Sequence, residues 1–272
     1  MNTSSAPLLQ VEGLTKKYGT GASAVTAVDE VSFTIGRGET LGLVGESGSG
    51  KSTTGFCVLQ LTTPTSGSVK LEGVELVGLS SRRLRSYRKE MQIVFQDPYD
   101  SLNPRMTVQQ IVAEPLRIHS RSTRSGEKSK VHELLELVGI SPDMADRYPA
   151  SFSGGQRQRI SIARALALNP KLIVCDEAVS ALDVSIQAQI INLLRDLQDE
   201  LSLSYLFISH DLAVVRAVAD SLAVMRGGRI VESGPADTVF ERPATEYTQA
   251  LMNAVPVPNH KPLHNAEKEF TA

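Results

Sequence analysis

Four short apolar runs recur along the chain, and a polar, charged or glycine residue follows each; they span residues 40–44, 91–95, 172–175 and 205–208. Continuous apolar runs of this length are typical of strands that are buried on both faces. Helical patterns separate most of the runs, which predicts an α/β fold with a mainly parallel central sheet. Ligands of such sheets bind outside the carboxyl ends of the strands, so we expect the residues after the four runs to share one site.

Two further β-rich runs, 8–14 and 25–35, precede the first of these strands and predict an N-terminal antiparallel β subdomain. Between residues 107 and 139 the apolar positions return at helical spacing, and no strand pattern is evident up to Ala150. We therefore expect an inserted α-helical subdomain at about 100–165.

The C-terminal third of the chain also carries helical patterns. Residues 184–201 form a strongly amphipathic pattern, with Asp183 as the expected N-cap. Two short helices are expected within about 235–254, as a C-terminal extension of a single domain that spans 1–254. Residues 255–272 are polar and contain proline, which predicts a disordered tail.

The first apolar run leads into a glycine-rich loop, which matches the phosphate-binding pattern G-x-x-x-x-G-K-[ST] and reads Gly45-Glu46-Ser47-Gly48-Ser49-Gly50-Lys51-Ser52. A helix-competent run begins at Thr53, so the loop has the strand–loop–helix setting that this pattern requires. Glycines let backbone N–H groups converge on phosphate oxygens, and the helix start adds a positive dipole. In this pattern Lys51 reaches the outer phosphates and Ser52 ligates Mg²⁺. Residues 45–53 are therefore predicted to bind a triphosphate with Mg²⁺.

The residues that follow the other three runs have side chains suited to hydrolysis of a triphosphate. Asp176 can hold Mg²⁺ through its water shell, and Glu177 can polarise the attacking water as a general base. Gln96 can sense the γ-phosphate or ligate the metal, and His210 can hydrogen-bond the γ-phosphate. Each of them alone would be an ordinary strand-end, capping or surface residue. Their shared position at strand ends favours one catalytic site that also includes Lys51.

A second helix start is built to face an anion. Ser153 and Gln156 form a capping box, and Gly154 and Gly155 in the first turn would let a ligand approach the backbone closely. The alternative is an ordinary capped helix. The chain thus has two phosphate-facing helix starts but one phosphate loop. A head-to-tail pair of chains would resolve this, because each bound nucleotide would be covered by the Ser153–Gln156 turn of the other chain.

The composition argues against nucleic-acid binding, a membrane span and a histidine metal site. The 272 residues carry a net charge of −2 and a pI near 6.2, so no basic field recruits nucleic acid. No run of 18 apolar residues is present, and the N-terminus has no signal-peptide pattern. The two cysteines lie in apolar stretches and read as buried hydrophobes, and the five histidines lack metal-ligand spacing.

These motifs, in this order, resemble the ATP-binding cassette family over roughly residues 8–232. The phosphate loop, Gln96, the signature turn 152–156, Asp176, Glu177 and His210 all stand where the family has them. The resemblance implies ATP and Mg²⁺ as cofactors, the residues from Ser180 to Asp183 as the family's D-loop with Asp183 among the nucleotide-binding residues, and Tyr18 as the ring that stacks on adenine. Tyr18 could otherwise be a surface tyrosine. Ala178 departs from the family, which usually has proline there, and this puts the fine placement of Glu177 in question.

A narrower resemblance is to the ATPase subunits of bacterial oligopeptide, dipeptide and nickel importers. It rests on the segments 95–105 and 179–189 and on the C-terminal Pro243 and Tyr247-Thr248. It implies an ATP hydrolase coupled to transmembrane transport, at the cytoplasmic face of the inner membrane. Such importers have two paired ATPases, and the chain looks more like the second, or "F-type", of the pair. The implied partners are a second ATPase subunit (a sibling or a copy), two membrane permease subunits and, indirectly, a solute-binding protein.

Peptides are the expected solute, with nickel or another small solute as the alternative. A non-transport cassette is a further alternative, but such proteins usually carry two cassettes, coiled-coil arms or basic domains. A small-molecule kinase would lack the second glycine-rich helix start. A catalytically silent cassette would have lost some of the catalytic residues, and Lys51, Asp176, Glu177 and His210 are all present.

Overall fold

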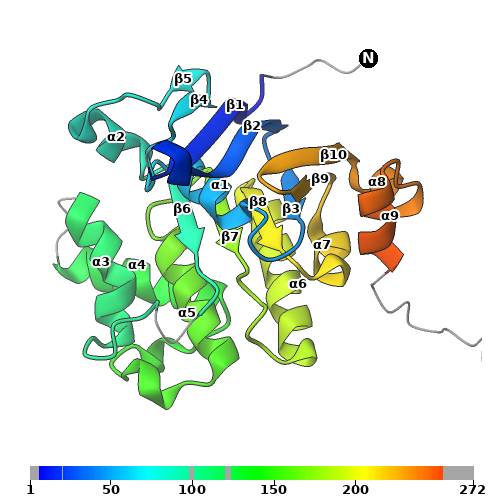
Figure 1. Cartoon of the computed structure of the whole chain (residues 1–272). Helices are drawn as coiled ribbons and strands as arrows, with labels where there is room; N and C mark the ends of the chain where they lie inside the picture. The colour runs from blue at the N-terminus through cyan, green and yellow to red at the C-terminus, as the bar shows by residue number, and fades with distance from the viewer. Residues whose placement is uncertain (1–5, 20, 98–100, 120–123, 254–272) are drawn as a thin grey trace, which may run out of the picture.

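The computed structural model describes residues 6–19, 21–97, 101–119 and 124–253. Its centre is a six-stranded sheet in the order β10-β9-β3-β8-β7-β6, in which only β10 is antiparallel to its neighbour (Figure 1). The mainly parallel α/β sheet predicted from the sequence is therefore confirmed. The strand bounds are β3 Thr40–Val44, β6 Met91–Val94, β7 Leu172–Asp176, β8 Ser204–Ser209, β9 Ser221–Arg226 and β10 Arg229–Pro235.

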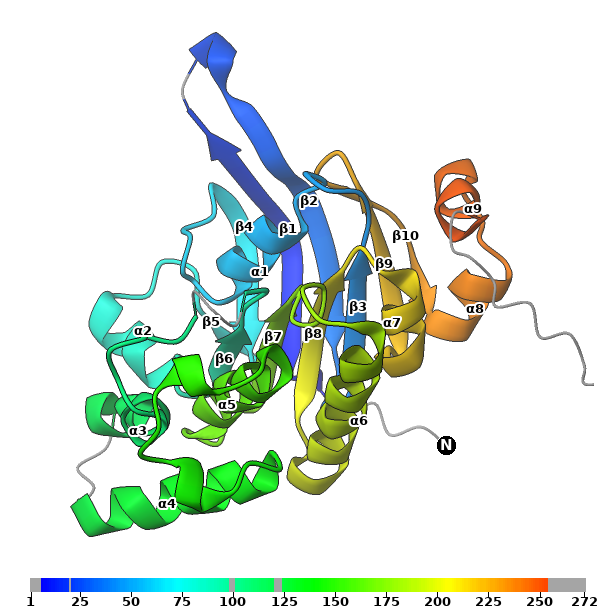
Figure 2. The same cartoon turned by 90° about the horizontal axis from the view of Figure 1, so that it is seen from below.

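A second, antiparallel sheet lies beside the first, in the order β2-β1-β4-β5. Its first two strands form the expected hairpin ahead of β3, and the far end of this hairpin projects from the molecule (Figure 2). The bounds are β1 Leu9–Tyr18, β2 Val25–Ile35, β4 Ser66–Leu71 and β5 Val74–Glu75, with a short 3₁₀ turn η1 at Gly21–Ser23.

Alternation along the central strands explains why their sequences are apolar throughout. In β7, Leu172 and Val174 pack into a core shared with the antiparallel sheet, whereas Ile173 and Cys175 face a second core under the helices. Helix α1 (Lys51–Val58) belongs to the first core, since its Cys57 and Val58 are fully buried there. Because both faces of the sheet are covered there, the inner strands β3, β7 and β8 need no polar face.

Helices α3, α4 and α5 pack against one another on the side of the sheet away from the hairpin (Figure 2). Helices α6 and α7 cover the same face nearer to β3 and β8. The helix bounds are α2 Ser81–Tyr87, α3 Val108–His119, α4 Arg124–Leu137, α5 Gly154–Leu166, α6 Val184–Leu201, α7 Leu212–Val218, α8 Ala236–Glu241 and α9 Glu246–Asn253, with 3₁₀ turns η2 at Pro142–Met144 and η3 at Pro149–Ser151.

Asp183 is the N-cap residue of α6, as predicted, although its side chain makes no capping hydrogen bond. The expected disordered tail at 255–272 lies outside the described residues. Within the described ranges, no helix combines the length and the apolar character that crossing a bilayer requires.

Candidate functional site

The carboxyl ends of the parallel strands bring the candidate residues together at one edge of the sheet. The hydroxyl of Ser52, at the start of α1, donates a hydrogen bond to Asp176 Oδ1 at the end of β7, over 2.8 Å and 124 residues of sequence. At the end of β8, His210 Nδ1 lies 3.1 Å from Glu177 Oε1. The order β3-β8-β7 places these pairs side by side, as expected from parallel strands.

The glycine-rich loop approaches neighbouring backbone too closely for any side chain at two positions. A Cβ on Gly45, whose φ is +148°, would lie 2.1 Å from the carbonyl oxygen of Met225 in β9. A Cβ on Gly50, whose φ is +104°, would lie 2.2 Å from the carbonyl oxygen of Ala27 in β2. These glycines therefore let the loop lie between the two sheets, in close contact with the backbone of both.

Lys51 is buried inside this loop, with 5% of the residue exposed. Its ammonium donates hydrogen bonds to the carbonyl oxygens of Gly45 and Glu46, each over 2.8 Å. Burial lowers the pKa of Lys51, while the negative charges of Glu177, Asp176 and Glu46 oppose that shift. The loop thus holds a desolvated cation at the place where the pattern expects phosphate oxygens.

Asp176 is the matching buried anion, with 8% of the residue exposed. Burial raises the pKa of this carboxyl, and the Glu177 charge adds to the increase, whereas the Ser52 hydrogen bond and Lys51 oppose it. A hydroxyl and a carboxylate oxygen at hydrogen-bonding distance are ligands that suit Mg²⁺, which takes few protein ligands and keeps several waters. Within the described residues no group of three or more His, Cys, Asp or Glu side chains forms a fuller metal cage.

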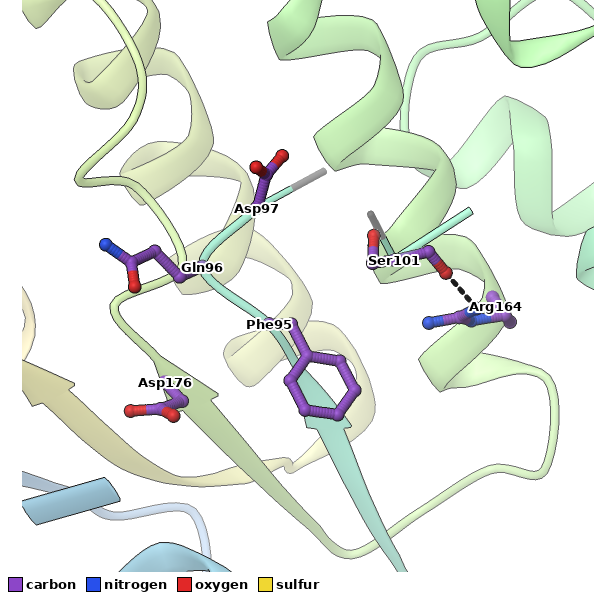
Figure 3. Close-up of a pocket in the computed structure, with 6 residues that line it drawn as sticks. All are labelled: Phe95, Gln96, Asp97, Ser101, Arg164 and Asp176. Atoms are coloured by element: carbon purple, nitrogen blue, oxygen red, sulfur yellow. Dashed lines mark hydrogen bonds between the residues drawn. The ribbon is translucent and has the colours of Figure 1, made fainter. Parts of the chain in front are cut away.

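Gln96 completes this edge from β6. It lines a pocket of about 470 Å³ together with Asp176 and Phe95, and its side chain and that of Asp176 extend to the same side (Figure 3). Arg164 of α5 also lines this pocket, a placement that the sequence did not predict. Its Nη1 donates to the carbonyl oxygen of Ser101 over 2.6 Å, which ties the segment beyond Gln96 to α5. The only signal for it in the sequence is an arginine within an apolar helix pattern.

Glu177 has a backbone conformation that the sequence did not reveal. Its φ is +50°, in the left-handed region that a glutamate rarely adopts. The N–H of Glu177 donates to the carbonyl oxygen of Ile208 over 2.9 Å, so β8 holds the strained residue in place. Its side chain is 18% exposed and that of His210 is 55% exposed. Strain of this kind is maintained only where the surroundings enforce it, and such places are often functional sites.

The predicted capping box at the start of α5 is present. Gln156 N donates to Ser153 Oγ over 3.3 Å, and Ser153 N donates to Gln156 Oε1 over 3.0 Å. The reason given for Gly155 needs correction, because a Cβ there would lie 2.5 Å from Ile186 Cγ2 of α6. Gly155 therefore permits close packing of α5 on α6. Gly154 has looser surroundings, since a Cβ there would lie 3.4 Å from Leu182 Cδ2.

The remaining candidates lie at the surface. Tyr18 ends β1 with 45% of the residue exposed, and Lys16 Nζ lies 4.9 Å from its ring centroid. Asp183 is exposed at the start of α6, and Thr53 is half-buried in the first turn of α1. Within the described residues, no hydrogen bond joins the Ser153–Gln156 turn to the phosphate loop of the same chain.

Comparison with known families matches residues 28–180 to the family described as "ABC transporter". Residues 231–269 match "Oligopeptide/dipeptide transporter, C-terminal region". The first match covers more than half of the chain and contains every candidate residue except Tyr18, Asp183 and His210.

Among relatives, the chain is 53% identical to a probable peptide ABC transporter ATP-binding protein of Sinorhizobium fredii, over 94% of this chain and 74% of the relative. It is 52% identical to an oligopeptide transport ATP-binding protein of Bacillus subtilis, over 93% of this chain and 83% of the relative. A solved cassette, described as a dimer in a post-hydrolysis state bound to ADP and Pi, superposes with a TM-score of 0.75 at 29% identity, over 84% of this chain and 98% of that chain.

The buried carboxyl of Asp176 makes a pH-dependent prediction for the chain without nucleotide or metal. Its folded pKa lies above its ordinary value of 3.8, so the folded state binds the proton more tightly than the unfolded state. The stability that this group contributes is therefore fully present below pH 3.8 and is lost as the pH rises through the folded pKa.

Asp176→Asn, which removes the charge, should thus raise the unfolding free energy at pH 7, and this gain should shrink as the pH is lowered. Urea unfolding in EDTA measures it, with the exposed Asp183→Asn as the matched control. A less stable Asp176→Asn variant at pH 7 would contradict the account.

Proposed function

The chain belongs to the ABC transporter family as an ATP-hydrolysing cassette, and we propose that it powers a bacterial importer of peptides. The main support for ATP hydrolysis is that one edge of the sheet holds both the Ser52–Asp176 hydrogen bond and the close pair of Glu177 and His210. Support for peptides comes from the C-terminal match at 231–269 and from relatives whose names state peptide or oligopeptide transport. Nickel or another small solute is the alternative within this branch.

In this proposal the phosphate loop, residues 45–53, grips the triphosphate of ATP, and Tyr18 stacks on the adenine ring. Lys51 exchanges its carbonyl partners for the outer phosphate oxygens. Burial has desolvated this ammonium, so its attraction to the phosphate charge is stronger than it would be in water. Ser52, Asp176 and Gln96 would hold Mg²⁺, which supplies charge neutralisation on the phosphates.

Glu177 then accepts the proton of the attacking water as general base. His210, within 3.1 Å, orients the Glu177 carboxylate and hydrogen-bonds the γ-phosphate. The enforced conformation of Glu177 keeps the carboxylate at the end of β7, where Asp176 lies beside it. Ala178 is buried behind it, so the missing proline leaves the turn packed.

The Ser153–Gln156 turn supplies the rest of the site from a second chain. Its capping box defines the start of α5, and a helix start of this kind can bind an anion through its positive dipole. Two cassettes in a head-to-tail arrangement would each cover the partner's nucleotide, with Asp183 at the contact between them. The partner is a sibling cassette or a copy of this chain.

The complex would also contain two membrane permease subunits and, indirectly, a solute-binding protein, so the chain is placed peripherally at the cytoplasmic face of the membrane. We infer from the family resemblance that the permease contacts the region from Gln96 to Pro104 and the helical subdomain, to which Arg164 belongs. Arg164 joins the segment after Gln96 to α5, the helix that begins with Ser153. A permease that moves this segment would therefore move the signature turn as well.

Glu177→Gln should lower ATP turnover by roughly a hundredfold or more, because an amide cannot take the proton from water. ATP binding should persist, and the variant should accumulate as a closed dimer with ATP. Phosphate release and sedimentation velocity measure the two effects, with the exposed Glu200→Gln as control. Near-normal hydrolysis in Glu177→Gln would remove the general-base role.

The solute is tested by purifying the native complex with its solute-binding protein and identifying the bound ligand by mass spectrometry. Peptides are the expected ligand. Recovery of a nickel chelate or another small solute, with no peptide, would replace the peptide assignment and leave the ATPase role intact.

A further inference from the structure

The C-terminal helix α9 reaches the phosphate loop through one side chain. The backbone N–H of Glu46, the second residue of the loop, donates a hydrogen bond to the hydroxyl oxygen of Tyr247 over 3.3 Å. These residues lie 201 positions apart in the sequence. Helices α8 and α9 lie beside β10, the edge strand of the central sheet (Figure 1). Both helices follow the catalytic motifs in the sequence.

The ring of Tyr247 is itself held in place. The guanidinium of Arg226, at the end of β9, lies 4.7 Å from the ring centroid, which is a cation–π distance. Arg226 follows Met225, whose carbonyl oxygen is the close neighbour of Gly45. The same strand end therefore supports both the tyrosine and the first residue of the loop.

A carboxylate anchors the start of α9. Glu232 of β10 accepts hydrogen bonds from the N–H groups of Ala244 over 2.7 Å and Thr245 over 3.0 Å. Thr245 Oγ1 in turn accepts from the N–H of Thr248, which caps the first turn. These bonds fix the direction of α9, and so the reach of Tyr247 does not depend on a flexible linker.

Both ends of one peptide unit are thereby clamped. The unit between Gly45 and Glu46 has its carbonyl oxygen bonded by Lys51 Nζ over 2.8 Å and its N–H bonded by Tyr247. Rotation of this unit would break both hydrogen bonds. Gly45 has no Cβ to restrict its own backbone, so these external partners determine how the unit is oriented.

We propose that Tyr247 is a positioning residue that holds the first peptide unit of the phosphate loop in its binding orientation, so that the C-terminal helix sets the ATP affinity of this chain. The inference rests on the proposed ATP-binding role of the loop. A loop that is ordered before the nucleotide arrives binds more tightly, because less conformational entropy is lost on binding.

Tyr247→Phe tests this, since it removes the hydroxyl and keeps the ring against Arg226. The dissociation constant for MgATP of the full chain should rise roughly three- to tenfold, the size of one net hydrogen bond. The unfolding midpoint without nucleotide should fall only slightly, because ring burial is preserved and the hydrogen bond that is lost is exposed. Tyr87→Phe on α2, a half-buried tyrosine away from the loop, is the matched control and should change neither value.

Amide hydrogen exchange gives a readout that a merely structural role would not move. In Tyr247→Phe the Glu46 amide should exchange faster, while the Thr54 amide, bonded to Gly50 O over 2.9 Å inside α1, should keep its rate. Unchanged MgATP affinity and unchanged Glu46 exchange would overturn the proposal while ATP binding by the wild type still stands. A wild-type chain that fails to bind MgATP would overturn the proposed function and this inference with it.

Discussion

Two opposite charges buried at one sheet edge are the constraint on which the rest of the structure depends. Lys51 and Asp176 are each more than nine-tenths buried. Burial lowers the pKa of Lys51 and raises the pKa of Asp176, so it favours the neutral form of both side chains. Removing an ion from water costs several kcal/mol even after relaxation. Phosphate oxygens beside Lys51 and a metal ion beside Asp176 would supply the missing counter-charges. The fold thus prepares, without ligand, the electrostatic environment that a metal–triphosphate complex needs.

The fold keeps that edge rigid from several sides. The parallel strands β3, β8 and β7 carry the residues, and two glycines of the loop, Gly45 and Gly50, fit against β9 and β2 without space for a side chain. The strained backbone of Glu177 is tied to β8. By contrast, the Ser153–Gln156 turn at the start of α5 makes no hydrogen bond to the phosphate loop of its own chain among the described residues. A rigid half-site and a helix start that is not bonded to it are what a site shared between two chains requires.

The central strands and the grouping of most candidate residues at their ends could be predicted from the sequence, because both follow from short-range patterns. Continuous apolar runs such as 172–175 identify doubly buried strands, and parallel pairing then brings their ends together. Features that arise from tertiary contacts were not accessible. Gly155 faces Ile186, the Asp183 side chain caps nothing, and the left-handed φ of Glu177 is enforced by Ile208. Neither local pattern nor composition encodes such contacts.

The claim that a second chain completes the site is tested most directly by complementation between two variants. Lys51→Ala disables the phosphate loop, and Ser153→Ala disables the turn that should act on the partner's nucleotide. Each variant alone should be nearly inactive. A one-to-one mixture should recover about a quarter of wild-type ATP turnover, because half of the dimers are mixed and each mixed dimer has one complete site. A mixture no more active than the two variants measured separately would contradict a site shared between two copies of this chain.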